Sequence, residues 1–186
     1  MALRVCCLFI ALLFFGFCGG QRDCYPKAKG GEPMKIEIKS SAFQDGGMIP
    51  KLYTCDGQDF SPALSWSGVP SNAKSLALIV DDPDAPVGTW VHWVVFNIPP
   101  GQKELVEKIL PSPSLNDGAR HGKNSWGKLG YGGPCPPGGT HRYYFKLYAL
   151  DRMLDLQSGI TKSQLLKAME GHILSEGQLM GKYRRM

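Results

Sequence analysis

The chain has 186 residues, of which 43% are hydrophobic and 20% charged, and its formal net charge is +5. This composition fits one folded domain with an ordinary core, and it excludes a disordered chain and a fibre built on a glycine repeat. The 21 Lys and Arg residues are scattered along the sequence, so we do not expect a nucleic-acid-binding protein.

The first 20 residues have the pattern of a secretory signal peptide. Arg4 supplies a positive start, residues 5–17 form an unbroken apolar run, and small residues follow at 18–20. The run is short for a membrane span, which makes an uncleaved anchor the less favoured alternative. We therefore expect cleavage after Gly20 and secretion into an oxidising compartment.

Beyond the signal peptide we expect a polar, flexible arm at 21–33 and a single domain at 34–186.

Three cysteines remain, Cys24, Cys55 and Cys135, a number that permits one disulfide. Cys55 and Cys135 lie in turn-rich segments beside the polar motifs described below, so we favour a bridge between them. Cys24 is then free or joined to another chain. The alternative is that all three are simply small residues. No Cys or His pair has zinc-ligand spacing, so we expect no metal.

Strand patterns dominate this domain. Alternating or continuous apolar residues predict strands at 35–39, 64–66, 75–80, 90–98 and 143–150. Clusters of Gly, Pro, Asp and Ser separate these segments and predict turns.

Helical patterns are few. Residues 161–174 carry apolar side chains at helical spacing, and Thr161 with Gln164 has the pattern of a capping box. The pattern also allows a short helical turn at 103–110. We therefore predict a mainly β fold, an antiparallel sandwich with one late amphipathic helix.

The first polar motif is the loop at 81–86. Asp81, Asp82 and Asp84 are three carboxylates within four positions, and they repel one another unless solvent, N–H groups or cations relieve them. The motif's prolines stiffen the loop, and the apolar segment before it delivers it to one edge of a sheet. For Asp81 alone, we favour a charged turn held by hydrogen bonds from its own side chain.

The second motif is Trp90-Val91-His92-Trp93. Strand alternation predicts Trp90 and His92 on one face, with Val91 and Trp93 on the other. A histidine among apolar neighbours tends toward its neutral form unless a carboxylate holds its proton. This segment alone favours a core histidine, but Asp82 lies ten residues earlier, a hairpin-like distance that favours a contact.

The third motif is the glycine- and proline-rich loop at 132–139 with the strand that follows it. Such a loop can expose its N–H groups to an anion. His141 and Tyr143 share one face of the following strand, whereas Arg142 points the other way, toward an acidic surface residue. Beside a His/Asp pair, this arrangement predicts a small anion-binding pocket. His121 and His172 are assigned to packing or to the surface.

The three motifs D-P-D-A-P, W-x-H and G-P-x-P-P…H-R-Y, in this order, resemble those of the phosphatidylethanolamine-binding proteins, also called Raf kinase inhibitor proteins. The fuller pattern is similar to the bacterial and archaeal branch, and it runs from about Met34 to Tyr183. The resemblance implies a two-sheet antiparallel β fold with a pocket for a phosphate or a phospholipid head group, and no cofactor.

Carried onto this chain, the resemblance places six residues at the pocket: Asp82, Trp90, His92, Gly133, His141 and Tyr143. An ionised carboxylate repels phosphate, so we expect Asp82 either to orient a histidine or to receive an ammonium group. His92, His141, Tyr143 and the loop N–H groups are the expected donors to the anion.

The leading functional prediction is a secreted, non-catalytic binding protein for a phosphate-bearing ligand, either a phospholipid head group such as phosphatidylethanolamine or a phosphorylated partner. One alternative is a hydrolase that uses the His/Asp groups as acid and base, although no nucleophile motif supports it. Another is serine protease inhibition through an exposed loop. The signal peptide argues against a cytosolic kinase as partner. No second long apolar run predicts a transmembrane span.

Overall fold

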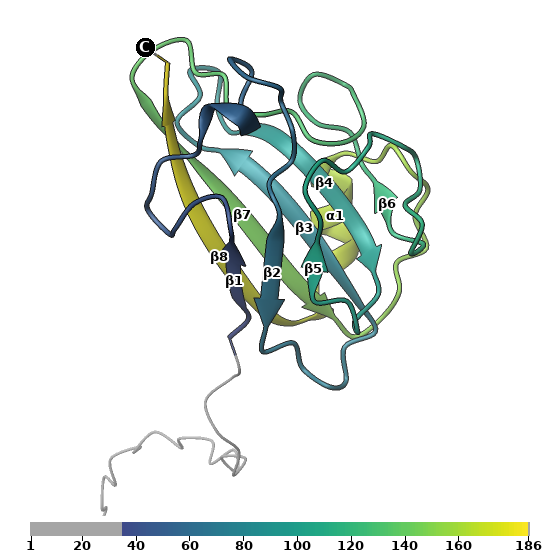
Figure 1. Cartoon of the computed structure of the whole chain (residues 1–186). Helices are drawn as coiled ribbons and strands as arrows, with labels where there is room; N and C mark the ends of the chain where they lie inside the picture. The colour runs from purple at the N-terminus through teal and green to yellow at the C-terminus, as the bar shows by residue number, and fades with distance from the viewer. Residues whose placement is uncertain (1–34, 186) are drawn as a thin grey trace, which may run out of the picture. The chain divides into compact units, whose positions relative to one another are not determined.

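The computed structural model describes residues 35–185, which form two antiparallel sheets and one short α-helix (Figure 1). The smaller sheet has the strand order β1 (Glu37–Ser40), β2 (Leu64–Ser67), β5 (Glu104–Leu105). The larger sheet has the order β6 (Arg120–His121), β4 (Trp90–Ile98), β3 (Ser75–Asp82), β7 (Thr140–Leu150), β8 (Ile173–Arg184). The helix α1 spans Lys162–Met169, and a single 3-10 turn, η1, spans Lys51–Tyr53. The predicted β-sandwich with one amphipathic helix is therefore confirmed.

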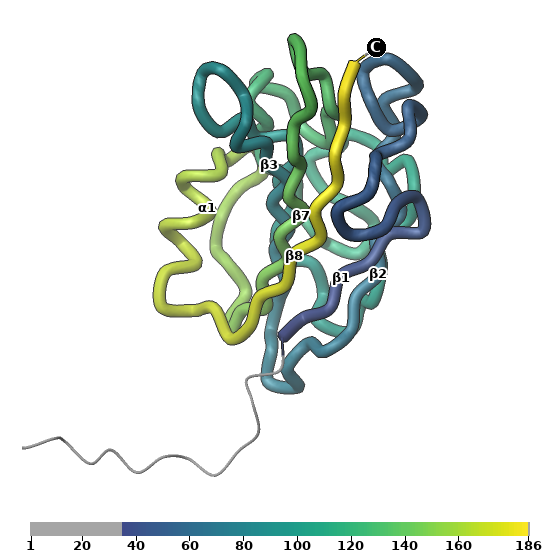
Figure 2. Tube along the Cα trace, turned by 90° about the vertical axis from the view of Figure 1, so that its left-hand side faces the viewer, coloured from purple at the N-terminus to yellow at the C-terminus, as the bar shows by residue number. Residues whose placement is uncertain are grey.

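The larger sheet is covered on both faces. Figure 2 shows β1 and β2 on one side of β3, β7 and β8, with α1 on the other. The main core fills the space between the two sheets, and a smaller core joins the larger sheet to α1. Strand β3 is buried at every position because it lies between these two cores. This burial explains why its sequence is a continuous apolar run rather than an alternating one.

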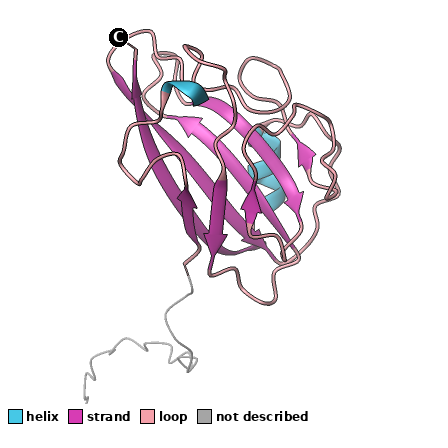
Figure 3. Ribbon diagram, in the orientation of Figure 1, coloured by secondary structure: helices cyan, strands magenta, loops and turns pink. Residues whose placement is uncertain are grey.

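Strands make up most of the regular structure in the described range (Figure 3). The predicted strands at 64–66, 75–80, 90–98 and 143–150 are confirmed. Three of them are longer than predicted, because β2 continues to Ser67, β3 continues to Asp82 and β7 begins at Thr140. The extensions of β3 and β7 bring polar motif residues into the sheet itself. The expectation that Asp81 lies in a turn is wrong, since it is a β3 residue.

The predicted helix at 161–174 is correct at its start and wrong at its end. The Thr161–Gln164 capping box is present, but the helix stops at Met169 and Gly171 adopts a positive φ of 74°. The chain then turns back and forms β8, a long strand that the sequence patterns did not predict. The segment 103–110 contains the short strand β5 instead of a helical turn.

Strand β4 contains an irregularity at His92. Val80 of β3 pairs with Trp93, whereas the next residue, Asp81, pairs with Val91, so His92 is an extra residue in β4. For this reason the predicted alternation is wrong at Trp93. Its side chain lies in the main core between the sheets and not on the face of the sheet opposite to that of His92.

The proposed signal peptide (1–20), the arm (21–33) and Cys24 lie outside the described residues. Within 35–185, no helix combines the length and apolar character that a membrane crossing requires.

Candidate functional site

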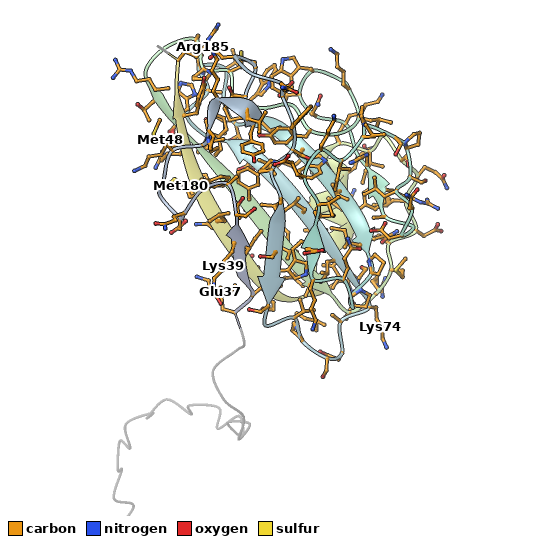
Figure 4. All side chains as sticks on the ribbon, in the orientation of Figure 1. Glu37, Lys39, Met48, Lys74, Met180 and Arg185 are labelled. Carbon is orange, nitrogen blue, oxygen red and sulfur yellow. A yellow bond between two sulfur atoms is a disulfide. The ribbon has the colours of Figure 1, made fainter. Side chains whose placement is uncertain are left out.

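A cavity of about 490 Å³ lies where β3 ends and β4 and β7 begin. This is the end of the larger sheet at which Figure 4 places Arg185, with Lys74 at the opposite end. Five of the six predicted residues line the cavity: Asp82, Trp90, His92, Gly133 and His141. Tyr143 lies behind the wall instead, fully buried, with its ring 5.1 Å from the His92 ring between centroids.

Strand pairing brings the three motifs together. Asp82 of β3 pairs with Trp90 of β4, and Asp81 pairs with Tyr144 of β7. The last residues of β3 therefore lie between the first residues of its two neighbours. This placement follows from antiparallel pairing of three strands that are predicted from sequence, so the motif order alone brings the polar residues to one end of the sheet.

Asp82 orients His141, not His92. Its Oδ2 accepts a hydrogen bond from His141 Nδ1 at 2.7 Å, and its Oδ1 accepts one from the backbone N–H of Asp84 at 2.8 Å. Both side chains are buried. With Nδ1 bound to the carboxylate, Nε2 of His141 is the ring nitrogen left for a ligand. The expected contact between Asp82 and His92 is wrong, because His92 bonds elsewhere.

His92 donates from Nδ1 to the carbonyl oxygen of Gly132 at 2.6 Å. Its ring packs edge-on against Trp126 and Tyr143, with centroid distances of 5.1 Å to each. Burial lowers the pKa of His92, although the Gly132 carbonyl partly opposes this effect. His92 is therefore a neutral imidazole with hydrogen on Nδ1 and a lone pair on Nε2.

Gly132 and Gly133 do not offer their N–H groups to the cavity as predicted for the glycine loop. The Gly133 N–H donates to Asp59 Oδ1 at 2.6 Å, and the Gly132 N–H donates to the His92 carbonyl oxygen at 2.9 Å. A Cβ at Gly133 would lie 2.4 Å from the Tyr53 carbonyl oxygen and 2.5 Å from Asp59 Oδ1. Gly133 is thus required by close packing of two loops and not by exposure of its amide to a ligand.

Asp59, Trp126 and Lys128 are among the cavity-lining residues that sequence reasoning missed. Asp59 has a φ of 57°, which is uncommon for a residue other than glycine, and burial raises the pKa of its carboxyl. One signal pointed to Asp59: it lies four positions after Cys55, in the loop that the predicted disulfide joins to the glycine loop.

Cys55 and Cys135 form a disulfide, as predicted, and both residues line the cavity. Two hydrogen bonds support the same junction: Cys55 N–H to Pro134 O at 3.1 Å, and Tyr131 Oη–H to Tyr53 O at 2.9 Å. Both cysteines are exposed. The loop that carries Asp59 is therefore fixed to the glycine loop at the cavity rim.

The three carboxylates of the first motif have separate partners. Asp81 is buried on the opposite face from the cavity, where it binds Lys146 Nζ at 3.0 Å and also Lys162 Nζ. Asp84 pairs with Arg142 at 2.6 Å, and this guanidinium lowers the pKa of Asp84 to about 2. Arg142 thus points away from the cavity toward an acidic residue, as expected. Mutual repulsion is relieved by basic partners in all three cases.

The chemical groups of the cavity wall include imidazoles, carboxylates, aromatic rings, the Tyr131 hydroxyl, the Asn124 amide and one lysine. No Ser or Thr belongs to the lining, and its two cysteines are joined in the disulfide. Residues 35–185 contain no cluster of three His, Cys, Asp or Glu side chains arranged to hold a metal ion. His121 is buried away from the lining, and His172 pairs with Asp151 at 3.0 Å.

Comparisons with known proteins give a consistent result. Residues 39–184 match the family model described as phosphatidylethanolamine-binding protein. A UPF0098 protein of Methanothermobacter thermautotrophicus is 57% identical over 150 residues, which are 81% of this chain and 99% of that protein. A UPF0098 protein of Aquifex aeolicus is 46% identical over 153 residues, which are 81% of this chain and 89% of that protein.

The solved structures that are similar to this one include the following two. A putative phosphatidylethanolamine-binding protein homolog from Chlamydia trachomatis, CT736, has a TM-score of 0.76 and 46% identity, over 82% of this chain and 99% of that one. Escherichia coli YbcL, described as a new member of the mammalian PEBP family, has a TM-score of 0.75 and 30% identity, with the same coverage of 82% and 99%.

Proposed function

The chain belongs to the phosphatidylethanolamine-binding protein family, in a branch with bacterial and archaeal members, and from this premise we propose that its cavity binds a phosphate-bearing ligand without converting it. The ligand is a phospholipid head group such as phosphoethanolamine, or a phosphorylated partner. The observation that carries the proposal is the buried Asp82–His141 pair at the cavity.

The Asp82–His141 pair suits a phosphate for an electrostatic reason. An anion at His141 Nε2 favours a proton there, and the Asp82 carboxylate at 2.7 Å from Nδ1 stabilises the imidazolium that results. The repulsion between Asp82 and the phosphate is offset in part, because His141 and the Asp84 N–H each donate a hydrogen bond to one oxygen of the carboxylate. Lys128 adds a positive charge to the same wall.

Other groups fit the remainder of a small head group. Neutral His92 carries a lone pair on Nε2, which accepts hydrogen from a protonated phosphate oxygen or from an ammonium group. The rings of Trp90 and Trp126 lie 5.4 Å apart between centroids and form an aromatic corner of the cavity. An aromatic corner attracts alkyl chains and alkylammonium groups.

The described residues that line the cavity include no Ser, Thr or free Cys side chain, and the Tyr131 hydroxyl is engaged by the Tyr53 carbonyl oxygen, which supports binding rather than covalent catalysis. Hydrolysis by water with histidine as general base is the competing activity, because it uses the same Asp–His pair. The two differ in one measurable property, the turnover of a phosphoester.

Isothermal titration with phosphoethanolamine tests the proposal. We expect binding by the wild type and about tenfold weaker binding by Asp82→Ala, the size expected when a charge-assisted hydrogen bond is lost. Asp151→Ala is the matched control, since it removes the carboxylate of the Asp151–His172 pair at the other end of β7. Equal affinity in wild type and Asp82→Ala contradicts the assigned role of Asp82.

A second measurement separates binding from catalysis. Incubation of the protein with a phosphomonoester and a phosphodiester should leave both intact while phosphoethanolamine still binds. Steady turnover that is lost in Asp82→Ala would establish a hydrolase instead. Mass spectrometry of protein secreted by its own host tests the proposed secretion, because cleavage after Gly20 leaves Gln21 as the first residue.

A further inference from the structure

A single peptide group lies between the carboxylate of Asp59 and the ring of His92. The Gly132 carbonyl oxygen accepts hydrogen from His92 Nδ1 at 2.6 Å. The N–H of the same peptide unit, that of Gly133, donates to Asp59 Oδ1 at 2.6 Å. Carboxylate, peptide and imidazole therefore form one continuous chain of hydrogen bonds, in which each bond polarises the next.

The residues that flank this peptide in the sequence do not by themselves fix its orientation. The carbonyl and the N–H of a peptide point in opposite directions, so a flipped peptide would present N–H to the imidazole instead of an oxygen. Glycine on both sides of the bond makes such a flip sterically easy. A charged acceptor on the N–H side opposes the flip, and Asp59 is that acceptor.

Asp59 has an energetically unfavourable backbone conformation, and contacts between loops hold it in place. Its φ of 57° lies in the left-handed region, where a residue with a side chain is disfavoured. Its loop is joined to the glycine loop by the Cys55–Cys135 bridge and by the bond from Tyr131 Oη to Tyr53 O. These two connections hold the loop of Asp59 against the glycine loop, where the carboxylate meets the Gly133 N–H.

We propose that Asp59 is a positioning residue for His92, acting through the Gly132–Gly133 peptide. A carbonyl oxygen can only accept hydrogen, so this peptide orientation requires hydrogen on His92 Nδ1 and leaves the Nε2 lone pair for the ligand. The inference rests on the proposed function in that it assigns His92 Nε2 to the ligand. It goes beyond that function because it adds Asp59, which is linked to His92 only through a backbone peptide.

The direct test reads the His92 tautomer in the ligand-free protein by ¹⁵N NMR of histidine-labelled protein. The wild type should show hydrogen on Nδ1 alone. Asp59→Gly removes the acceptor while it permits the positive φ, and we expect a mixture of tautomers at His92 and about tenfold weaker phosphoethanolamine binding. Asp59→Asn keeps an acceptor and suits the left-handed backbone, so it should restore the single tautomer.

Two controls separate positioning from general damage. Asp56→Asn alters a carboxylate of the same loop that bonds Tyr183 and Arg185, and it should change neither readout. The His121 signal is an internal reference, because its Nδ1 bonds Ser112 O instead of the glycine loop.

A single Nδ1–H tautomer and wild-type affinity in Asp59→Gly overturn the proposal. If Asp59→Gly does not fold, as shown by a displaced His121 signal, Asp59→Asn decides. In Asp59→Asn, loss of the carboxylate charge should weaken the series of hydrogen bonds from residue 59 to His92. The His92 Nδ1 proton resonance should therefore move upfield, and an unmoved resonance overturns the proposal. Failure of the wild type to bind phosphoethanolamine contradicts the proposed function but leaves the tautomer result standing.

Discussion

The histidines of the domain fall into two classes according to the oxygen that faces Nδ1. His92 and His121 donate to the backbone carbonyls of Gly132 and Ser112. His141 and His172 face the carboxylates of Asp82 and Asp151, respectively. A carbonyl dipole compensates a positive ring only in part, so burial dominates and lowers the pKa of both His92 and His121. The cavity therefore combines one histidine of each class, a neutral acceptor and a ring paired with an acid.

Gly133 offers a test at the scale of one residue. In Gly133→Ala the new methyl meets the Tyr53 carbonyl oxygen and the Asp59 carboxylate, which would lie 2.4 and 2.5 Å away without movement. We expect the free energy of unfolding to fall by about 2 kcal/mol and phosphoethanolamine binding to weaken, measured by urea unfolding and titration. Gly138→Ala is the matched control, since a Cβ at Gly138 has no neighbour within 4 Å. Equal stability of the two variants contradicts the packing argument.

At the scale of elements, β4 and β8 mark the limits of prediction from sequence. β4 was predicted with its true bounds because seven of its nine residues are β-branched or aromatic, which leaves little ambiguity. β8 was missed because its inward positions include Gly177 and Gly181, which carry no apolar signal. A Cβ at Gly177 would lie 2.0 Å from the Ile36 carbonyl oxygen, so contact with a distant segment selects the glycine. That contact exists only in the folded chain.

The site also has one part that local sequence patterns predict and another that they do not. Asp82, His92 and His141 could be predicted because each lies in or beside a strong strand and belongs to a compact motif. Their partners could not, since pairing depends on the extra residue in β4 and on the meeting of two loops. Asp59 in particular reaches the site through a loop contact 74 positions along the chain. Local patterns therefore identify the groups present but not the hydrogen bonds between them.

The ionic cluster of Asp81, Lys146 and Lys162 fastens α1 to the centre of the larger sheet and offers a test at this scale. The side chain of Asp81 is 1% exposed, whereas those of Lys146 and Lys162 are 31% and 22% exposed. Replacing both lysines by Met leaves a buried carboxylate unpaired, which should lower the free energy of unfolding by about 3 kcal/mol or more. Asp81→Asn should cost about 1 kcal/mol, because the lysine ammonium groups can then turn to solvent. Equal losses in urea unfolding at pH 7.5 contradict this asymmetry.

For the whole molecule, the two histidines with lowered pKa values predict the response to acid. The unfolded chain protonates each ring near pH 6.5, whereas the folded rings bind a proton only at lower pH. The unfolded state then binds more protons, so the free energy of unfolding decreases as the pH falls below about 6.5. Urea unfolding between pH 7.5 and 5.5 should show this decrease, by at most about 1.4 kcal/mol per pH unit for each ring.

Substitution separates the contribution of one ring to this response. His121→Asn keeps a donor for the Ser112 carbonyl and removes the titrating group, so the slope of stability against pH should become smaller. His172→Asn changes a partly exposed ring beside Asp151 and is the control. An unchanged slope in His121→Asn shows that the acid sensitivity has another origin.

The bridge between Cys55 and Cys135 has a consequence for the order in which the chain acquires its structure. Its cysteines are 80 positions apart, whereas Cys24 is 31 positions from Cys55 (55 − 24). In an unstructured polypeptide the shorter loop closes with the smaller entropy loss, so random oxidation favours the incorrect partner. We therefore expect pairing with Cys135 to follow the meeting of the two loops, which bond through Cys55 N–H and Pro134 O. On this expectation the disulfide closes a cavity wall that the strands already shape, and Cys24 is the competing thiol.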